Sequence, residues 1–275
     1  MFMEQVRYYI YGLMELINKR TISEIVKNNY RTADVFKKHR INYCCAGSVT
    51  LAGACDNLGT NAALIANEVA EASIDLHGPA VALVREWKLD FLIEYIKNVH
   101  HRYLQVQLPL LGQQLVSFAG SHARKMPWIN ELLDTFNTLS VLLLEQDRQQ
   151  ELRVFPYLRQ LESAVTGDPD YGRLFIKTFR QPSGFFGQTE DQVANLFTQM
   201  RTLTADYSIP GNACVNHQVV LHKLNELDDN CQAHYYLENA ILLPRALVME
   251  AQLPGSSRQP GSNRDIPESP GTSGN

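Results

Sequence analysis

The chain has 275 residues, of which 45% are hydrophobic and 20% charged, so it can bury a core in one large domain or two smaller ones. A formal net charge of −4 and a pI of about 6.1 argue against nucleic acid as the main partner. No apolar run is long enough for a membrane span, and the N-terminus does not resemble a signal peptide. The five cysteines, two of them adjacent, do not suggest a secreted disulfide framework, and we expect a cytoplasmic protein.

Helical patterns dominate the chain. Apolar residues recur at spacings of three and four, and alternating strand patterns are scarce, which predicts an all-α fold. An apolar-faced N-terminal extension could cap a domain or mediate a homodimer. After it, Thr21-Ile-Ser-Glu24 fits a capping box that opens a short helix. The expected organisation is a helical extension at 1–20, a small helical domain at 21–62, a linker at 63–87, a helical bundle at 88–253 and a disordered tail at 254–275.

The bundle is predicted from long amphipathic segments that are separated by clusters of helix-breaking residues. Short connections between long helices favour an up-down arrangement. Helices are expected at 89–116, 129–144, 149–165, 191–204 and 216–243.

Two adjacent cysteines, Cys44 and Cys45, precede the turn-forming pair Ala46-Gly47. Neighbouring cysteines cannot both chelate one metal comfortably, and a disulfide between them closes a strained ring that is easily reduced. If exposed, the pair would suit thiol transfer, a transient metal contact or redox sensing. The alternative is that both are small buried apolar residues.

His234 and Glu238 stand four residues apart, so they share one face of a predicted helix. Leu227, Cys231 and Ile241 continue that face, which should therefore point into a core. Helical proteins build iron sites from an imidazole and a carboxylate that converge inside a bundle. The alternative is an ordinary surface or core pair.

Four segments near the N-terminus follow one another in order: Thr21-Ile-Ser-Glu-Ile-Val26, Arg31-Thr-Ala-Asp-Val-Phe36, Ile41-Asn-Tyr-Cys-Cys-Ala-Gly47 and Thr50-Leu-Ala-Gly-Ala-Cys55. They resemble the N-terminal domain of the repair-of-iron-centres family, di-iron proteins linked to mending iron–sulfur clusters damaged by nitric oxide or peroxide. The chain departs from the family at Tyr30, Asn42 and Ala46, where Pro, Asp and Gly are typical. The stretch from Leu237 to Leu247 is similar to the end of the same proteins.

This resemblance implies an iron-binding stress-response protein whose partners are damaged iron–sulfur proteins, and an iron donor rather than a classical enzyme. No phosphate-cradling Gly-rich loop and no nucleophile elbow is visible, and no catalytic residue is assigned. Cys44 and Cys45 would serve delivery or redox coupling. The alternative is a degenerate bundle without a full di-iron site that acts as a redox sensor or interaction module.

The resemblance further implies that residues 88–253 form a hemerythrin-like four-helix bundle. In that family two helices each present His-x-x-x-Glu, ten and six residues before a Pro. His234 and Glu238 occupy these positions before Pro244.

The other helix of this kind departs from the family, because Gln146 and Gln150 stand at the ligand positions before Pro156. Neutral amides are poor iron ligands and cannot bridge two irons. The neighbouring Asp147 and Glu151 would point inward after a small rotation of the helix, and a solvated face is the alternative.

Two further helices of the family each contribute one His. His101 aligns with the first, although helical periodicity favours His100 as the inward residue. Glu190 occupies the expected place of the second, where the alternative is an acid favoured by the helix dipole. His122 is a weaker candidate, because 21 helical residues would separate it from His101 by roughly 31 Å. The predicted cofactor is iron, bound as a pair in the family and in a single or weakened site here.

Overall fold

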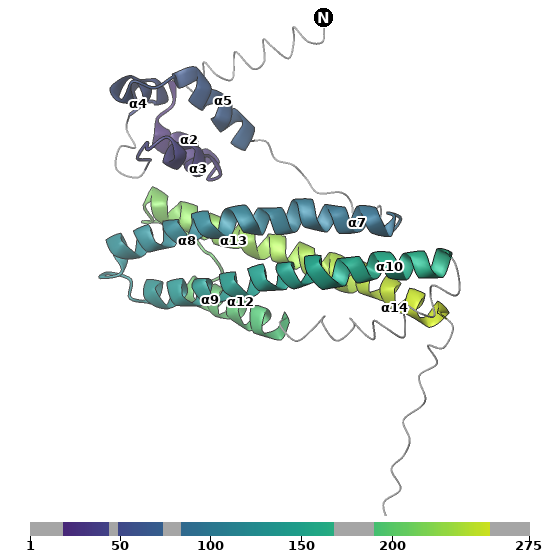
Figure 1. The fold of residues 1–275 in the computed structure, drawn as a ribbon. Coiled ribbons are helices and arrows are strands. Elements are labelled where there is room, and N and C mark those ends of the chain that lie inside the picture. Colours follow the sequence, from purple (N-terminus) through teal and green to yellow (C-terminus); the bar gives the residue numbers. More distant parts are fainter. Residues whose placement is uncertain (1–18, 44–48, 74–83, 168–189, 254–275) are drawn as a thin grey trace, which may run out of the picture.

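The computed structural model describes residues 19–43, 49–73, 84–167 and 190–253, and within these ranges the fold is all-α, as predicted (Figure 1). The expected tail, the double cysteine and most of the N-terminal extension lie outside the described residues. None of the described helices is long and apolar enough to span a bilayer.

The small domain begins with the predicted capping box. The Thr21 hydroxyl accepts from the Glu24 amide at 3.2 Å, and the Glu24 carboxylate accepts from the Thr21 amide at 2.9 Å. An apolar core joins its helices, and residues 62–72 belong to that core through Ile65 and Val69, although the sequence assigned most of this stretch to the linker. The four helices are α2 (Ile22–Asn28), α3 (Thr32–Lys38), α4 (Leu51–Leu58) and α5 (Ala62–Ala72).

Three long helical rods and one shorter helix form the bundle (Figure 1). The predicted helices at 129–144 and 149–165 are one continuous rod, because neither glycine nor proline separates them. The α7–α8 rod comprises α7 (Leu89–Tyr95), η1 (Ile96–His101) and α8 (Arg102–His122); the α9–α10 rod comprises α9 (Trp128–Gln149), η2 (Gln150–Val154) and α10 (Phe155–Thr166); the α13–α14 rod comprises α13 (Val215–Leu237), η3 (Glu238–Leu242) and α14 (Leu243–Gln252); and the shorter helix is α12 (Glu190–Leu203).

Each rod contains one π-helical turn, η1, η2 or η3. Pro156 and Pro244 stand within two residues after η2 and η3. A proline has no N–H and its ring collides with the carbonyl four residues earlier, so a wider turn before it relieves both problems. The π turns alter the direction of the side chains around them, and such turns often mark functional sites.

Two apolar clusters fill the bundle, and a band of polar residues separates them along the rods. One cluster includes Leu104, Leu143 and Cys231, and the other includes Phe155 and Leu237. These polar residues therefore lie near the π turns, between the two apolar clusters.

The small domain rests on the α13 end of the bundle. Val215 and Val219 of α13 pack into the small-domain core. The buried ammonium of Lys223 pairs with Asp34 of α3, and the hydroxyl of Tyr30 donates to Glu226 at 2.7 Å. These contacts fix the position of the small domain on the bundle.

Candidate metal centre

Three buried side chains converge where the α7–α8 and α13–α14 rods meet. His101 ends η1, His234 lies in the last turn of α13, and Glu238 begins η3. His234 Nε2 and Glu238 Oε1 are 3.0 Å apart, and one ligand atom from each of the three residues lies within 4.8 Å of the others. The structure thus brings together three of the four metal ligands predicted from the sequence.

The α9–α10 rod contributes three more polar side chains, all around the ring of His101. His101 Nδ1 is 2.8 Å from Glu151 Oε1, whereas Nε2 is 3.0 Å from Gln150 Oε1 and 3.6 Å from Asp147 Oδ1. Asp147 and Gln150 are buried, and the side chain of Glu151 is 32% exposed. Among the acids, Asp147 faces the interior and Glu151 lies behind the imidazole.

Two carboxylate oxygens at this site have no hydrogen-bond partner within the described residues. They are Asp147 Oδ2 and Glu238 Oε2, and both are fully buried. A buried carboxylate oxygen without a partner is costly, and such groups normally pair or coordinate a metal. A cation held by these carboxylates and the neighbouring imidazoles would satisfy both oxygens, so the residues present fit a metal ion.

The protonation states suit a metal ion as well. Burial, followed by the nearby charge of His234, lowers the pKa of His101, and burial lowers the pKa of His100 to about 4. Neutral imidazoles keep the lone pair that a metal requires. Burial also raises the pKa of Asp147 to about 7, although nearby His234 opposes the shift and Glu238 adds to it. Metal binding would displace the proton from this carboxyl.

His100 and His101 are both buried, although they are adjacent. His100 stacks on the ring of His234, with centroids 5.4 Å apart and planes at 8°, and its Nδ1 lies 3.3 Å from Asn230 Oδ1. Both residues belong to the π turn η1, whose wider path lets consecutive side chains face the core. Asn230 was not predicted, but it precedes His234 by four residues, a spacing that could have indicated it.

The remaining predicted residues lie elsewhere. Gln146, expected to face the metal, instead accepts a hydrogen bond from Tyr235 at 2.9 Å and is half-buried. Glu190 opens α12, and its side chain lies outside the described residues. His122 ends α8, 21 residues beyond His101 on the same rod, roughly 31 Å away.

Cys44 and Cys45 also lie outside the described residues, but the structure describes Tyr43, the residue before them. The hydroxyl of Tyr43 accepts from Gln114 at 2.9 Å and donates to Asn216 at 3.2 Å. Gln114 is 13 residues beyond His101 along the rod, about 20 Å. The Tyr43 contact therefore lies well away from the candidate metal centre, whereas the Tyr30 contact reaches Glu226, eight residues before His234 on α13, about 12 Å.

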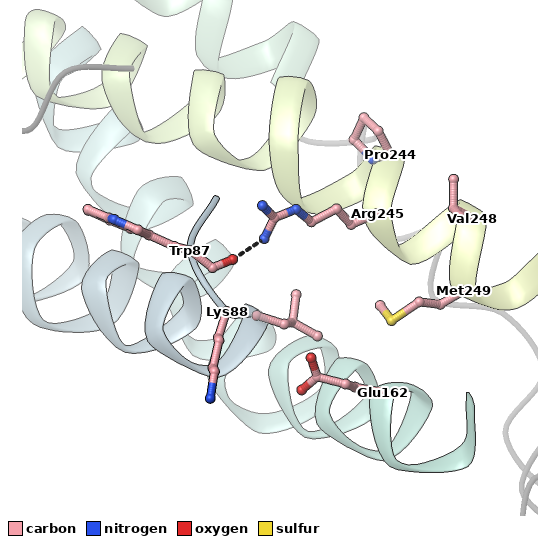
Figure 2. Close-up of a pocket in the computed structure, with 8 residues that line it drawn as sticks. Trp87, Lys88, Glu162, Pro244, Arg245, Val248 and Met249 are labelled. Carbon is pink, nitrogen blue, oxygen red and sulfur yellow. Dashed lines mark hydrogen bonds between the residues drawn. The ribbon is translucent and has the colours of Figure 1, made fainter. Parts of the chain in front are cut away.

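A surface pocket opens between α7, α10 and α14 (Figure 2). Trp87, Lys88, Glu162 and Met249 line it, and the guanidinium of Arg245 donates to the Trp87 carbonyl at 2.6 Å. None of the converging site residues lines this pocket.

Comparison with known proteins relates both parts of the chain to bacterial repair proteins. The model of the ScdA_N family, described as a domain of unknown function (DUF542), matches residues 18–73. The chain is 26% identical over 227 residues to the iron-sulfur cluster repair protein ScdA of Staphylococcus haemolyticus, covering 82% of this chain and 97% of the relative. It is 26% identical over 233 residues to the iron-sulfur cluster repair protein YtfE of Escherichia coli O81, covering 83% and 97%. The similarity therefore extends well beyond the small domain into the bundle.

Proposed function

We propose, from the premise that this chain belongs to the repair-of-iron-centres family, that it holds iron in its buried His/carboxylate group and serves in the repair of iron–sulfur clusters. The observation that carries the proposal is the pair of unpartnered buried oxygens, Asp147 Oδ2 and Glu238 Oε2, beside two imidazoles. The relatives are named for cluster repair, which supports the same role here.

In this proposal one iron is bound by His101, His234, Glu238 and Asp147. Two neutral nitrogens and two anionic oxygens form a donor set that suits ferrous iron and holds it less firmly than thiolates would. Glu151 lies behind His101 and accepts from Nδ1, which leaves Nε2 to face the interior. A carboxylate in this position orients a ligating histidine and raises its basicity.

In the resembled family a second His-x-x-x-Glu pair supplies a glutamate to the metal. In this proposal Asp147 supplies that carboxylate instead. Gln150 supplies only a neutral amide at this level of the rod, so a second iron would lack an anionic bridge on this side. We therefore propose one tight iron per chain and at most a weak second one. Iron released from this site would serve clusters damaged by nitric oxide or oxidants, and the clients would be iron–sulfur proteins.

An alternative function has one specific observation in its favour. Both ring nitrogens of His101 already lie beside protein groups. A neutral imidazole donates to Glu151 Oε1 from Nδ1, and the Gln150 amide, turned over so that its NH2 faces Nε2, donates to the other nitrogen, which satisfies this imidazole without metal. A bundle of this kind could act as an interaction or sensor module. Iron binding requires Nε2 of His101 to lose its contact with the Gln150 side chain. The two functions therefore differ in whether ferrous iron displaces Gln150 from this nitrogen.

The deciding experiment is an anaerobic titration of metal-free protein with Fe(II), followed by removal of loose metal and measurement of iron per chain. We expect close to one iron in the wild type and none in His234→Ala. His217→Ala is the matched control, because His217 is a buried histidine on the same helix that lies outside the site. Iron-free wild type would refute the iron proposal and leave the interaction module.

A second assay tests repair itself. A [4Fe–4S] enzyme inactivated by nitric oxide or by peroxide is incubated with the iron-loaded protein, and recovery of its activity is followed. Recovery with the wild type, but not with His234→Ala or with an equal amount of free Fe(II), is expected. Equal recovery with free iron would remove the repair role while leaving iron binding intact.

A further inference from the structure

A second group of reactive side chains lies at the bundle end remote from the candidate metal centre. Cys214 is a free, half-buried cysteine at the N-cap of α13, and its Sγ is 3.4 Å from Nε2 of His122 at the end of α8. Cys214 precedes the first residue of the helix, and its backbone is extended, with φ −68° and ψ 164°. The sulfur is therefore not enclosed by a preceding helical turn.

The tautomer of His122 follows from its second contact. Nδ1 lies 3.2 Å from the carbonyl oxygen of Phe118, one turn earlier on α8. A carbonyl can only accept, so Nδ1 carries the proton and Nε2 presents a lone pair to the thiol. A nucleophile, a base and a group that orients the base thus follow one another, which is the arrangement that activates thiols in proteins.

The surroundings support the same chemistry. The sulfur sits at the N-terminus of a 23-residue helix, the end at which the backbone carries a partial positive charge. The Cys214 side chain makes no capping hydrogen bond to the helix, so its sulfur is not occupied as a helix cap. Cys55 and Cys231 differ, because both are fully buried and burial raises the pKa of each thiol.

We propose that Cys214 and His122 form an activated thiol that exchanges with low-molecular-weight disulfides. As the sulfur of Cys214 attacks one sulfur of the disulfide, Nε2 of His122 accepts the thiol proton. The original S–S bond breaks, a mixed disulfide forms on Cys214, and the leaving thiolate takes up the proton from His122. The disulfide is the oxidant, and the released thiol is its reduced half.

Modification here would act next to the contact between the domains. Val215 packs into the small-domain core, and Asn216 accepts from the Tyr43 hydroxyl. A mixed disulfide on Cys214 therefore stands beside residues that hold the small domain in place. This proposal does not depend on iron, and it survives if the metal proposal fails.

The test measures labelling of each cysteine by iodoacetamide and by oxidised glutathione at pH 7, resolved by peptide mass spectrometry, in native protein and in urea. A half-buried ordinary thiol reacts more slowly in the folded chain than in the unfolded one. We expect Cys214 to react several-fold faster in the folded chain, because thiolate reacts and thiol does not. Cys231 should be protected in the folded chain and serves as the internal reference.

Variants test whether His122 accepts the thiol proton or only packs against the thiol. In His122→Gln an amide still reaches the sulfur but cannot take its proton, so native labelling of Cys214 should fall below the unfolded rate. His217→Asn is the control, because His217 also packs on Phe118, with centroids 5.0 Å apart, yet its contact is not with the thiol. Native labelling of Cys214 that is slower than in urea, or unchanged in His122→Gln, overturns the proposal.

Discussion

The charge state of Asp147 makes a quantitative prediction for the metal-free protein. Its pKa is about 7 in the folded chain and near 3.8 as an ordinary carboxyl. Between these values the folded state retains a proton that the unfolded chain has lost, so the free energy of unfolding falls as pH rises. Three units at about 1.36 kcal/mol each amount to a cost of up to about 4 kcal/mol, fully present above pH 7 and absent below pH 4.

Replacing Asp147 by Asn mimics the protonated carboxyl and removes this cost. We expect metal-free Asp147→Asn to be more stable than the wild type by up to about 4 kcal/mol at pH 8 and by only about 1.6 kcal/mol at pH 5, with the difference nearly gone below pH 4. The same variant should lose iron, because an amide replaces an anionic ligand. The residue would thus lower the stability of the empty bundle in favour of metal binding.

The assay is urea unfolding of chelator-treated protein at pH 5 and pH 8, followed by circular dichroism. Asp134→Asn is the control, because Asp134 lies exposed on the same helix α9. It should leave the pH dependence unchanged. An Asp147→Asn protein that is less stable than the wild type at pH 8 would show that the carboxylate is compensated in the folded chain, and the argument for a metal would lose its basis.

Three other predictions concern the same rods and the domain contact. Gln150→Glu should raise iron per chain in the Fe(II) titration, because it adds a carboxylate beside His101; unchanged iron would mean that position 150 turns away from the metal. Glu151→Gln should weaken iron binding by about 10- to 100-fold through loss of the carboxylate behind that histidine, whereas Glu145→Gln, 52% exposed, should not. Asp34→Asn leaves the buried ammonium of Lys223 unpaired and should lower the free energy of unfolding by about 3–5 kcal/mol, while Lys223→Met should cost much less; equal losses in urea unfolding would argue against a buried charge as the cause.

Local spacing predicted much of the fold and half of the site. The capping box at Thr21 and the pairing of His234 with Glu238 depend on residues three or four apart within one helix, and both geometries appear in the structure. The all-α class follows from the same periodicity. Family resemblance selected His101, which periodicity alone had ranked behind His100. The two residues proved to be buried together, because a π turn carries both.

The amino-acid sequence by itself determined which segments are helical and where the α13–α14 rod presents its imidazole and carboxylate, since these depend on neighbours along one helix. Only the tertiary structure decided which face of the α9–α10 rod meets them. Counting back from Pro156 selected Gln146, by analogy with His234 before Pro244. Since η2 and η3 stand at the same distance before their prolines, the choice between Gln146 and Asp147 depends on how the rods pack against one another and not on the π turn. Asp147 faces the interior instead, while Gln146 bonds Tyr235. The pairing of Cys214 with His122 likewise joins residues 92 apart in the chain, which no local spacing relates.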